Sequence, residues 1–164
     1  MTGWTCATQS PILFISHRGE SYTAPENTMA AFRLAVARQT AGFECDVYLT
    51  ADDEIVCIHD ATTERTMDGN LTVASSTLAQ LKELKVGVQW KNTPFANERI
   101  PTLSEALSLA RDGMEIYVEI KCGTQIMSRL LQVMAAEPKA TPERVVFISF
   151  NSSVISAVRQ QLPA

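Results

Sequence analysis

The sequence has no long apolar run, no basic cluster and only two histidines, and each shortage narrows the possible functions. No apolar stretch approaches the roughly 20 residues that span a bilayer, so we expect no membrane-spanning helix. Lysine and arginine number 14 against 18 aspartates and glutamates, and no basic run could follow a phosphate backbone. A nucleic-acid partner is therefore not expected. The composition, 46% hydrophobic and 20% charged, is that of an ordinary globular domain.

Cysteine is also scarce and lacks the spacing of a metal finger. The four cysteines are Cys6, Cys45, Cys57 and Cys122, and three of them fall in probable strands, so we expect reduced structural thiols. The first eleven residues, MTGWTCATQSP, have neither the basic start nor the apolar segment of a signal peptide. Both features favour a cytoplasmic protein, because thiols stay reduced in the cytosol.

Strand and helix patterns alternate along most of the chain. Apolar runs predict strands at 12–16, 43–49, 54–59, 115–121 and 144–150, and helical periodicity predicts helices at 27–39, 103–112, 124–136 and 152–162. Asn27 and Ser104 are the expected N-caps of the first two helices. Residues 60–100, with a short helix near 76–84, are interpreted as a small insertion in a single domain that spans residues 1–164.

This alternation predicts parallel strands joined by crossover helices, which is an α/β fold. A closed (β/α)8 barrel and an open doubly wound sheet are the main alternatives. The motifs G-x-G-x-x-G and G-x-x-x-x-G-K-[ST] do not follow the first strand, so the sequence lacks the usual nucleotide-binding signs of an open sheet.

The segment FECDVYL, at 43–49, carries two carboxylates on one face. Side chains alternate along a strand, so Glu44 and Asp46 point the same way and the apolar residues between them point the other way. In EIYVEIK, at 115–121, the same count places Glu119 and Lys121 together. Buried carboxylates at close range repel one another and lose hydration, which a cation would offset. Three hard oxygen donors favour Mg²⁺ or Ca²⁺ over zinc.

The two histidines, His17 and His59, both follow predicted strands, and ligands of α/β folds bind where strands end. Imidazole titrates near neutrality, so one histidine can take a proton while the other gives one. Arg18 and Lys121 add fixed positive charge that suits a phosphate. With a metal ion, these groups indicate a phosphoryl-transfer site.

Each of these residues also has a purely structural interpretation. A histidine after a strand is more often a hydrogen-bonded structural residue than a catalyst. Glu44 and Asp46 could form a half-exposed face with Lys121 as their surface ion-pair partner. Glu26 and Asn27 are expected to cap and anchor the first helix. The functional interpretation is favoured because four strands deliver polar groups to one edge.

Six segments resemble one known family in their order and approximate spacing: SHRGESYTAPENTMAAF, FECDVYLTADDEIVCIHD, ERTMDG, IPTLSEAL, VEIK and VFISF. They resemble the glycerophosphodiester phosphodiesterase family, whose members are TIM barrels. The resemblance implies hydrolysis of small glycerophosphodiesters to glycerol 3-phosphate and an alcohol, with a divalent cation. A glycerol hydroxyl of the substrate would attack first and give a cyclic phosphate. By the same resemblance the metal ligands are Glu44, Asp46 and Glu119, the acid-base pair is His17 and His59, and the phosphate-contacting cations are Arg18 and Lys121.

The chain departs from this family in a loop and in length. Glu54 stands where the family usually has a glycine, and MDGNLTV lacks a second glycine, but both changes lie outside the expected chemistry. A (β/α)8 barrel takes about 250 residues, whereas this chain offers about the first five βα units. Unclosed barrel edges would offer a route to self-association.

Two other functions stay open. A lysophospholipase D-like or sphingomyelinase D-like enzyme would share the histidines and carboxylates, but residues 61–100 lack the long apolar insertion that would favour it. A non-catalytic remnant could serve as a binding or assembly module. Such a remnant would be expected to lose a histidine or a carboxylate, and this chain keeps all five.

Overall fold

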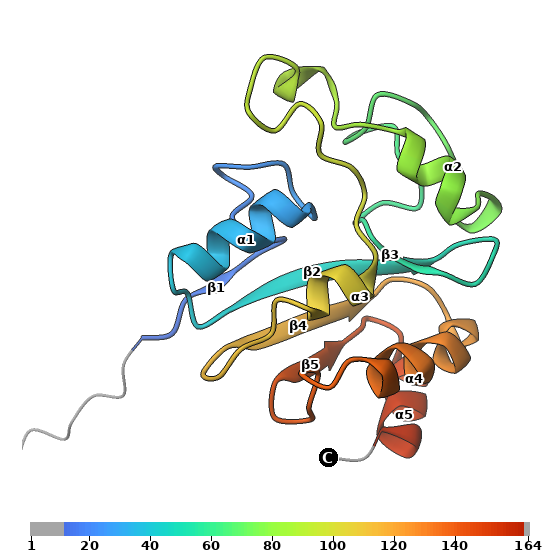
Figure 1. Ribbon diagram of the computed structural model, residues 1–164. Coiled ribbons are helices and arrows are strands. Elements are labelled where there is room, and N and C mark those ends of the chain that lie inside the picture. Colours follow the sequence, from blue (N-terminus) through green and yellow to red (C-terminus); the bar gives the residue numbers. More distant parts are fainter. Residues whose placement is uncertain (1–11, 163–164) are drawn as a thin grey trace, which may run out of the picture.

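The longest strand, β2 (Gly42–Leu49), pairs with three other strands and forms the centre of the sheet. The structure is a computed structural model that describes residues 12–162. Its sheet runs in the order β1 (Ile15–Ser16), β2, β4 (Glu115–Ile120) and β5 (Val145–Ile148), with parallel pairing throughout (Figure 1). The α/β prediction is confirmed. The expectations for Cys6 and for MTGWTCATQSP lie outside the described residues.

The strand predicted at 54–59 forms, but its expected parallel pairing is wrong. β3 (Ile55–Cys57) is antiparallel to β2, with Cys57 opposite Val47. The connection at 50–54 is a tight turn in which Thr50 donates its main-chain N–H to the carbonyl of Glu54 at 2.8 Å. A parallel crossover needs about a dozen residues, so this connection is too short. Within residues 12–162, four strands therefore make up the parallel part of the sheet, one fewer than the sequence suggests.

Helices cover the apolar face of this sheet. α1 (Met29–Ala37), α3 (Leu103–Leu107), α4 (Met127–Ala136) and α5 (Ser152–Gln161) all contribute side chains to the main core. Phe32 of α1 stacks on Phe43 of β2, with ring centroids 4.6 Å apart. Cys45 and Cys57 are free thiols in the same core, as expected. The side chains of β2 that point away from this core are free to build a polar site.

Two helix caps differ from the prediction. Thr28 rather than Asn27 caps α1, and it accepts a hydrogen bond from the main-chain N–H of Ala31 at 3.3 Å. Thr102 rather than Ser104 caps α3, because the glutamate three residues after it completes a capping box. Asn27 has a left-handed φ of 53°, and its side chain donates a hydrogen bond to Asp46 of β2.

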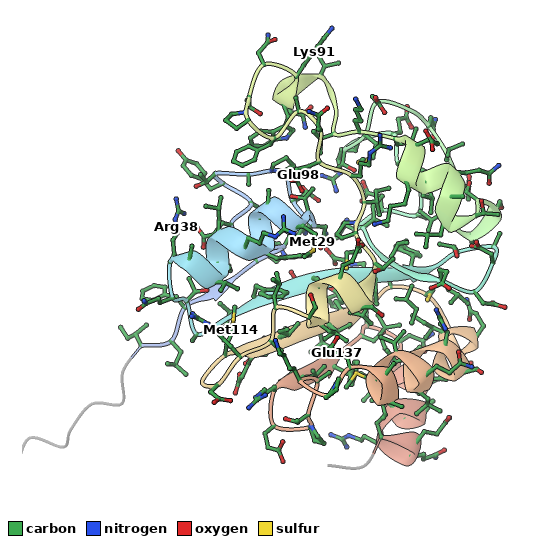
Figure 2. All side chains as sticks on the ribbon, in the orientation of Figure 1. Met29, Arg38, Lys91, Glu98, Met114 and Glu137 are labelled. Atoms are coloured by element: carbon green, nitrogen blue, oxygen red, sulfur yellow. The ribbon has the colours of Figure 1, made fainter. Side chains whose placement is uncertain are left out.

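Residues 60–100 pack around an apolar cluster of their own. They form α2 (Leu78–Glu83) and short 3₁₀ helices at Val73–Ser75 and Val88–Trp90, and a third 3₁₀ helix at Thr124–Ile126 leads into α4. The cluster joins this segment to β3 and contains Val56, Ile58, Met67, Val73, Leu81 and Ile100. Glu98 accepts a hydrogen bond from the N–H of Ala30 at 3.1 Å, next to Met29 at the start of α1 (Figure 2). The interpretation of residues 60–100 as an insertion stays a prediction.

The sheet is open at both sides. Within residues 12–162, β1 and β5 each pair on one side only. Apolar side chains beside these edges are exposed, among them Phe14 before β1 and Phe150 after β5. Association through these edges stays a prediction. In the described range, no helix has both the length and the apolar character that crossing a bilayer requires.

Candidate metal and phosphate site

Glu44, Asp46 and Glu119 meet on the polar face of the sheet. β2 and β4 pair in register so that Asp46 lies opposite Glu119, and Glu44 precedes Asp46 by two residues on the same face. One carboxylate oxygen from each residue lies within 4.8 Å of the other two. Glu44 and Asp46 are buried, with 6% and 0% of their surface exposed. The structure therefore brings together the three carboxylates that the sequence singles out.

The charges of these carboxylates are poorly compensated. Burial, followed by the charge of Asp46, raises the pKa of Glu44 to about 7. Within residues 12–162, Oε1 of Glu44 and Oδ1 of Asp46 are buried without a hydrogen-bond partner. A buried carboxylate oxygen without any partner, such as Oε1 of Glu44, is costly, and hard divalent cations bind carboxylate oxygens. The donor set fits Mg²⁺ or Ca²⁺.

Two cations flank the cluster. Nε of Arg18 lies 3.2 Å from Oδ2 of Asp46, and Nζ of Lys121 lies 2.9 Å from Oε1 of Glu119. Lys121 also approaches Oδ1 of Asp46 at 3.5 Å. Hydrogen bonding to Glu119 and the charge of Asp46 outweigh the effect of burial on Lys121 and raise its pKa. When all three carboxylates are ionised, their charge exceeds that of the two cations, so the cluster would attract a metal ion.

The turn after β1 is shaped by its contact with this cluster. Arg18 and Gly19 both have left-handed φ values, 55° and 72°. This conformation aims the main-chain N–H of Arg18 at Oε2 of Glu44, 2.8 Å away. A Cβ on Gly19 would lie 2.7 Å from the main chain of Ala31 in α1, so only glycine fits there.

The two histidines follow strands that run in opposite directions, because β1 is parallel and β3 antiparallel to β2. His17 follows β1 directly, is 69% exposed at its side chain, and places Nε2 3.9 Å from Oε2 of Glu44. His59 follows β3, which runs back along β2, and the preceding N–H of Ile58 donates to the carbonyl of Asp46 at 2.9 Å. A hairpin, rather than the end of a parallel strand, therefore holds the main chain just before His59 against the main chain of Asp46.

Comparison with known proteins gives the family of this chain. The model of the Glycerophosphoryl diester phosphodiesterase family matches residues 17–164. The chain belongs to this family. A glycerophosphodiester phosphodiesterase of Caldanaerobacter subterraneus is 38% identical over 154 residues, which cover 92% of this chain and 63% of the relative. A probable glycerophosphodiester phosphodiesterase of Mycobacterium tuberculosis is 34% identical and is covered over 60% of its length.

Solved structures of this family support the same assignment. An Oleispira antarctica phosphodiesterase, determined in complex with the product sn-glycerol-3-phosphate, matches with a TM-score of 0.83 at 32% identity. The match covers 93% of this chain and 63% of that one. This glycerophosphodiester phosphodiesterase relative confirms the expected partial TIM-barrel fold. The present chain spans less than two thirds of the length of these relatives.

Sequence reasoning misses one residue at the centre of this glycerophosphodiester phosphodiesterase-family site. Asn27 donates from Nδ2 to Oδ2 of Asp46 at 2.9 Å, and its Oδ1 accepts the main-chain N–H of Asp46 at 3.1 Å. Two hydrogen bonds to one residue fix the position of that carboxylate. The available signal is the pair Asn27–Thr28, because threonine can cap the helix and asparagine tolerates a left-handed φ.

An open cleft adjoins the carboxylates on the β5 side. Its lining residues are Glu119, Ile120, Lys121, Ser149, Phe150, Asn151 and Ser152. Nζ of Lys121 lies 6.0 Å from the centroid of the Phe150 ring, and Phe150 is 97% exposed. The cleft therefore presents a carboxylate, a cation and an apolar ring next to one another.

The raised pKa of Glu44 predicts how stability depends on pH in the presence of chelator. Because its folded pKa of about 7 exceeds the ordinary 4.5 of a glutamate, the folded chain binds a proton that the unfolded chain releases. Stability should therefore fall as pH rises from about 4.5 to about 7, by up to roughly 3 kcal/mol.

Urea unfolding of the wild type and of Glu44→Gln, both with chelator at several pH values, measures this effect. Glutamine cannot titrate, so the variant should lack this loss between about pH 4.5 and 7. Saturating Ca²⁺ should abolish the loss in the wild type. Equal pH dependence in the two proteins would show that Glu44 titrates in its ordinary range.

Proposed function

We propose that this chain carries the catalytic centre of a metal-dependent glycerophosphodiester phosphodiesterase that releases glycerol 3-phosphate and an alcohol. The main support is the meeting of Glu44, Asp46 and Glu119 on one face of the sheet, with Nε2 of His17 3.9 Å from Oε2 of Glu44. Membership of the family indicates the substrate class. The Oleispira antarctica relative was determined with sn-glycerol-3-phosphate, the product that this reaction would give.

In this proposal Glu44, Asp46 and Glu119 hold one Mg²⁺ or Ca²⁺. The bound cation would neutralise carboxylate repulsion and stabilise negative charge on the phosphoryl oxygens. Asn27 holds Asp46 in place through both ends of its amide. Because Asp46 is fully buried, the loss of this support would let its carboxylate leave the position that the other two require.

Arg18 and Lys121 bind the phosphate in this proposal, and His17 and His59 move the protons. A guanidinium has five N–H donors and an ammonium has three, so both cations keep donors for phosphate while they pair with the carboxylates. One histidine takes the proton of the attacking oxygen as it bonds to phosphorus. The other gives a proton to the alcohol oxygen as its bond to phosphorus breaks.

The test is release of glycerol 3-phosphate from glycerophosphocholine by the 164-residue chain. Chelator should stop the reaction, and excess Mg²⁺ or Ca²⁺ should restore it. Turnover that is indifferent to chelator would contradict the metal site. Cation binding without any turnover would contradict the catalytic role and favour a binding module. Faster cleavage of lysophosphatidylcholine than of glycerophosphocholine would favour a lysophospholipase D-like activity.

A further inference from the structure

His59 is held by a charged pair, Asp60 and Arg65, to which the proposed mechanism assigns no role. Nδ1 of His59 lies 2.6 Å from Oδ1 of Asp60, the next residue in the chain. The other oxygen of Asp60 accepts a hydrogen bond from Nε of Arg65 at 2.6 Å. The Asp60 carboxylate is thus fixed between a histidine and an arginine, and its rotation is restricted on both sides.

Glu26 holds the other end of the Arg65 guanidinium. The two terminal nitrogens of this guanidinium donate to both oxygens of Glu26, each at 2.8 Å. Glu26 also accepts a hydrogen bond from Nη1 of Arg18 at 3.0 Å, and Arg18 contacts Asp46. A continuous chain of charged groups therefore runs from the imidazole of His59 to the buried carboxylate cluster.

The charges in this network favour one protonation pattern. The hydrogen bond from Arg65 lowers the pKa of Asp60, so Asp60 is ionised and can only accept. Burial alone would raise the pKa of Glu26, but hydrogen bonds and charge from Arg65 outweigh it and lower the pKa. The two carboxylates raise the pKa of Arg65 further above its ordinary value. An ionised Asp60 requires the hydrogen of a neutral His59 to be on Nδ1.

We propose that Asp60 and Arg65 form a positioning pair that holds His59 in one orientation and tautomer, with Nε2 left to exchange a proton. This inference rests on the proposed function for its catalytic consequence, although its geometric content does not. It holds whichever histidine acts as the acid, because an imidazole bound at Nδ1 takes or gives a proton at Nε2 in both roles.

Arginine is specifically suited to this position. One guanidinium supplies Nε to Asp60 and two parallel N–H groups to Glu26, a fork that the single ammonium of lysine cannot reproduce. Arg65 is 47% exposed at its side chain, and ion pairs exposed to this degree add little to stability. The geometry that the pair imposes on His59 is therefore its more important effect.

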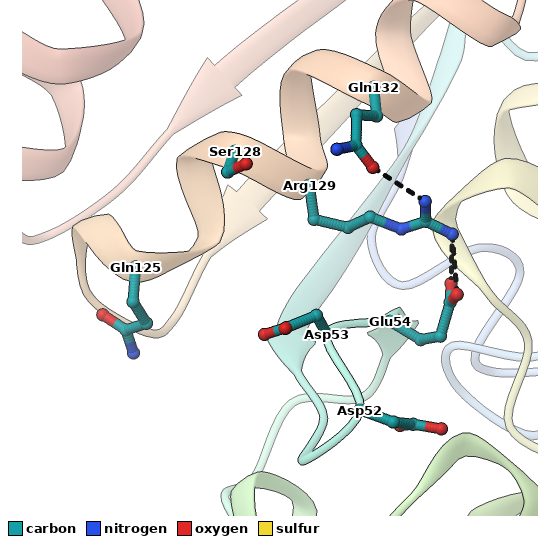
Figure 3. Close-up of a pocket in the computed structure, with 7 residues that line it drawn as sticks. All are labelled: Asp52, Asp53, Glu54, Gln125, Ser128, Arg129 and Gln132. Carbon is teal, nitrogen blue, oxygen red and sulfur yellow. Dashed lines mark hydrogen bonds and ion pairs between the residues drawn. The ribbon is translucent and has the colours of Figure 1, made fainter.

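The structure also supplies a matched control. Arg129 of α4 donates to both oxygens of Glu54 at 2.7 Å, with 33% of its side chain exposed (Figure 3). It lines a separate cavity, at the turn between β2 and β3, that shares no lining residue with the cleft beside Glu119. Arg129→Gln breaks a comparable ion pair without touching the network at His59.

The test combines imidazole ¹⁵N NMR at a pH above the ordinary histidine range with steady-state kinetics on glycerophosphocholine. Wild-type His59 should be in the Nδ1–H tautomer. Asp60→Asn and Arg65→Gln should shift it toward a mixture and lower kcat about 10- to 100-fold with little change in KM. Arg65→Lys should fail to restore kcat, and Arg129→Gln should behave like the wild type.

An Nε2–H tautomer in the wild type, or unchanged tautomer and kcat in both variants, would overturn the proposal. An equal loss of kcat in Arg129→Gln would also overturn it, because the effect would then be one of general stability. The NMR result needs no turnover. If the wild-type chain were inactive but Asp60→Asn still shifted the tautomer, the proposed function would fail while the positioning of His59 would stand.

Discussion

Replacing His59 with alanine should lower kcat for glycerophosphodiester hydrolysis by about 10²- to 10⁴-fold, the usual contribution of a general acid or base. His17→Ala should have an effect of the same size. Both side chains are at least 30% exposed, so neither truncation removes part of the core. Release of glycerol 3-phosphate at saturating cation measures the effect.

Folding and metal binding serve as controls for these histidine variants. Circular dichroism and urea unfolding should match the wild type. Cation affinity should also be close to wild type in His59→Ala, because His59 is not among the three carboxylate ligands. A variant that binds the cation normally and hydrolyses substrate at the wild-type rate would remove the acid-base assignment of that histidine.

Replacing Glu119 with glutamine should weaken Mg²⁺ or Ca²⁺ binding by more than about 100-fold. The loss of groups that merely support a metal ligand costs about 10- to 100-fold, and a direct ligand should cost more. Glutamine keeps an oxygen that can accept the hydrogen bond from Lys121, and it removes one charge from a repulsive cluster. The variant should therefore fold. Calorimetric titration with the cation measures the affinity.

The matched control for this variant is Glu115→Gln on the same strand. Glu115 begins β4, lies on the same face as Glu119, and accepts a hydrogen bond from the hydroxyl of Tyr117 rather than joining the cluster. This variant should bind the cation like the wild type. Equal affinities in all three proteins would show that Glu119 is not a ligand, whereas equal losses in both variants would indicate a general effect of charge.

The local part of this site could be predicted from the sequence. The two-residue alternation of β2 places Glu44 and Asp46 on the face opposite the core, because a strand leaves its side chains no other choice. Glu119 lies opposite Asp46 in β4. Predicting its place required only that the two strands be neighbours. The prediction succeeded here because each step depended on a single strand and on parallel pairing.

The remaining features depended on contacts between distant segments. The antiparallel direction of β3 was readable from its short connection, but the alternation of strands and helices across the chain obscured it. Arg65 reaches Glu26 across 39 residues, a contact that no periodicity encodes. Asn27 was assigned to a helix end because asparagine is a good cap, and only the positive φ of the folded chain shows its other use.

The chain spans 60 to 63% of the length of two curated relatives. All seven residues assigned to metal, phosphate and proton transfer are nevertheless in the part present.

Diffraction from crystals grown with Mn²⁺ is the most direct test that Glu44, Asp46 and Glu119 share one cation. Anomalous scattering locates the ion without any assumption about activity. We expect one strong peak at coordination distance, about 2.0 to 2.6 Å for hard cations, from oxygens of all three acidic side chains on β2 and β4. A peak elsewhere, or none at saturating Mn²⁺, would contradict this expectation.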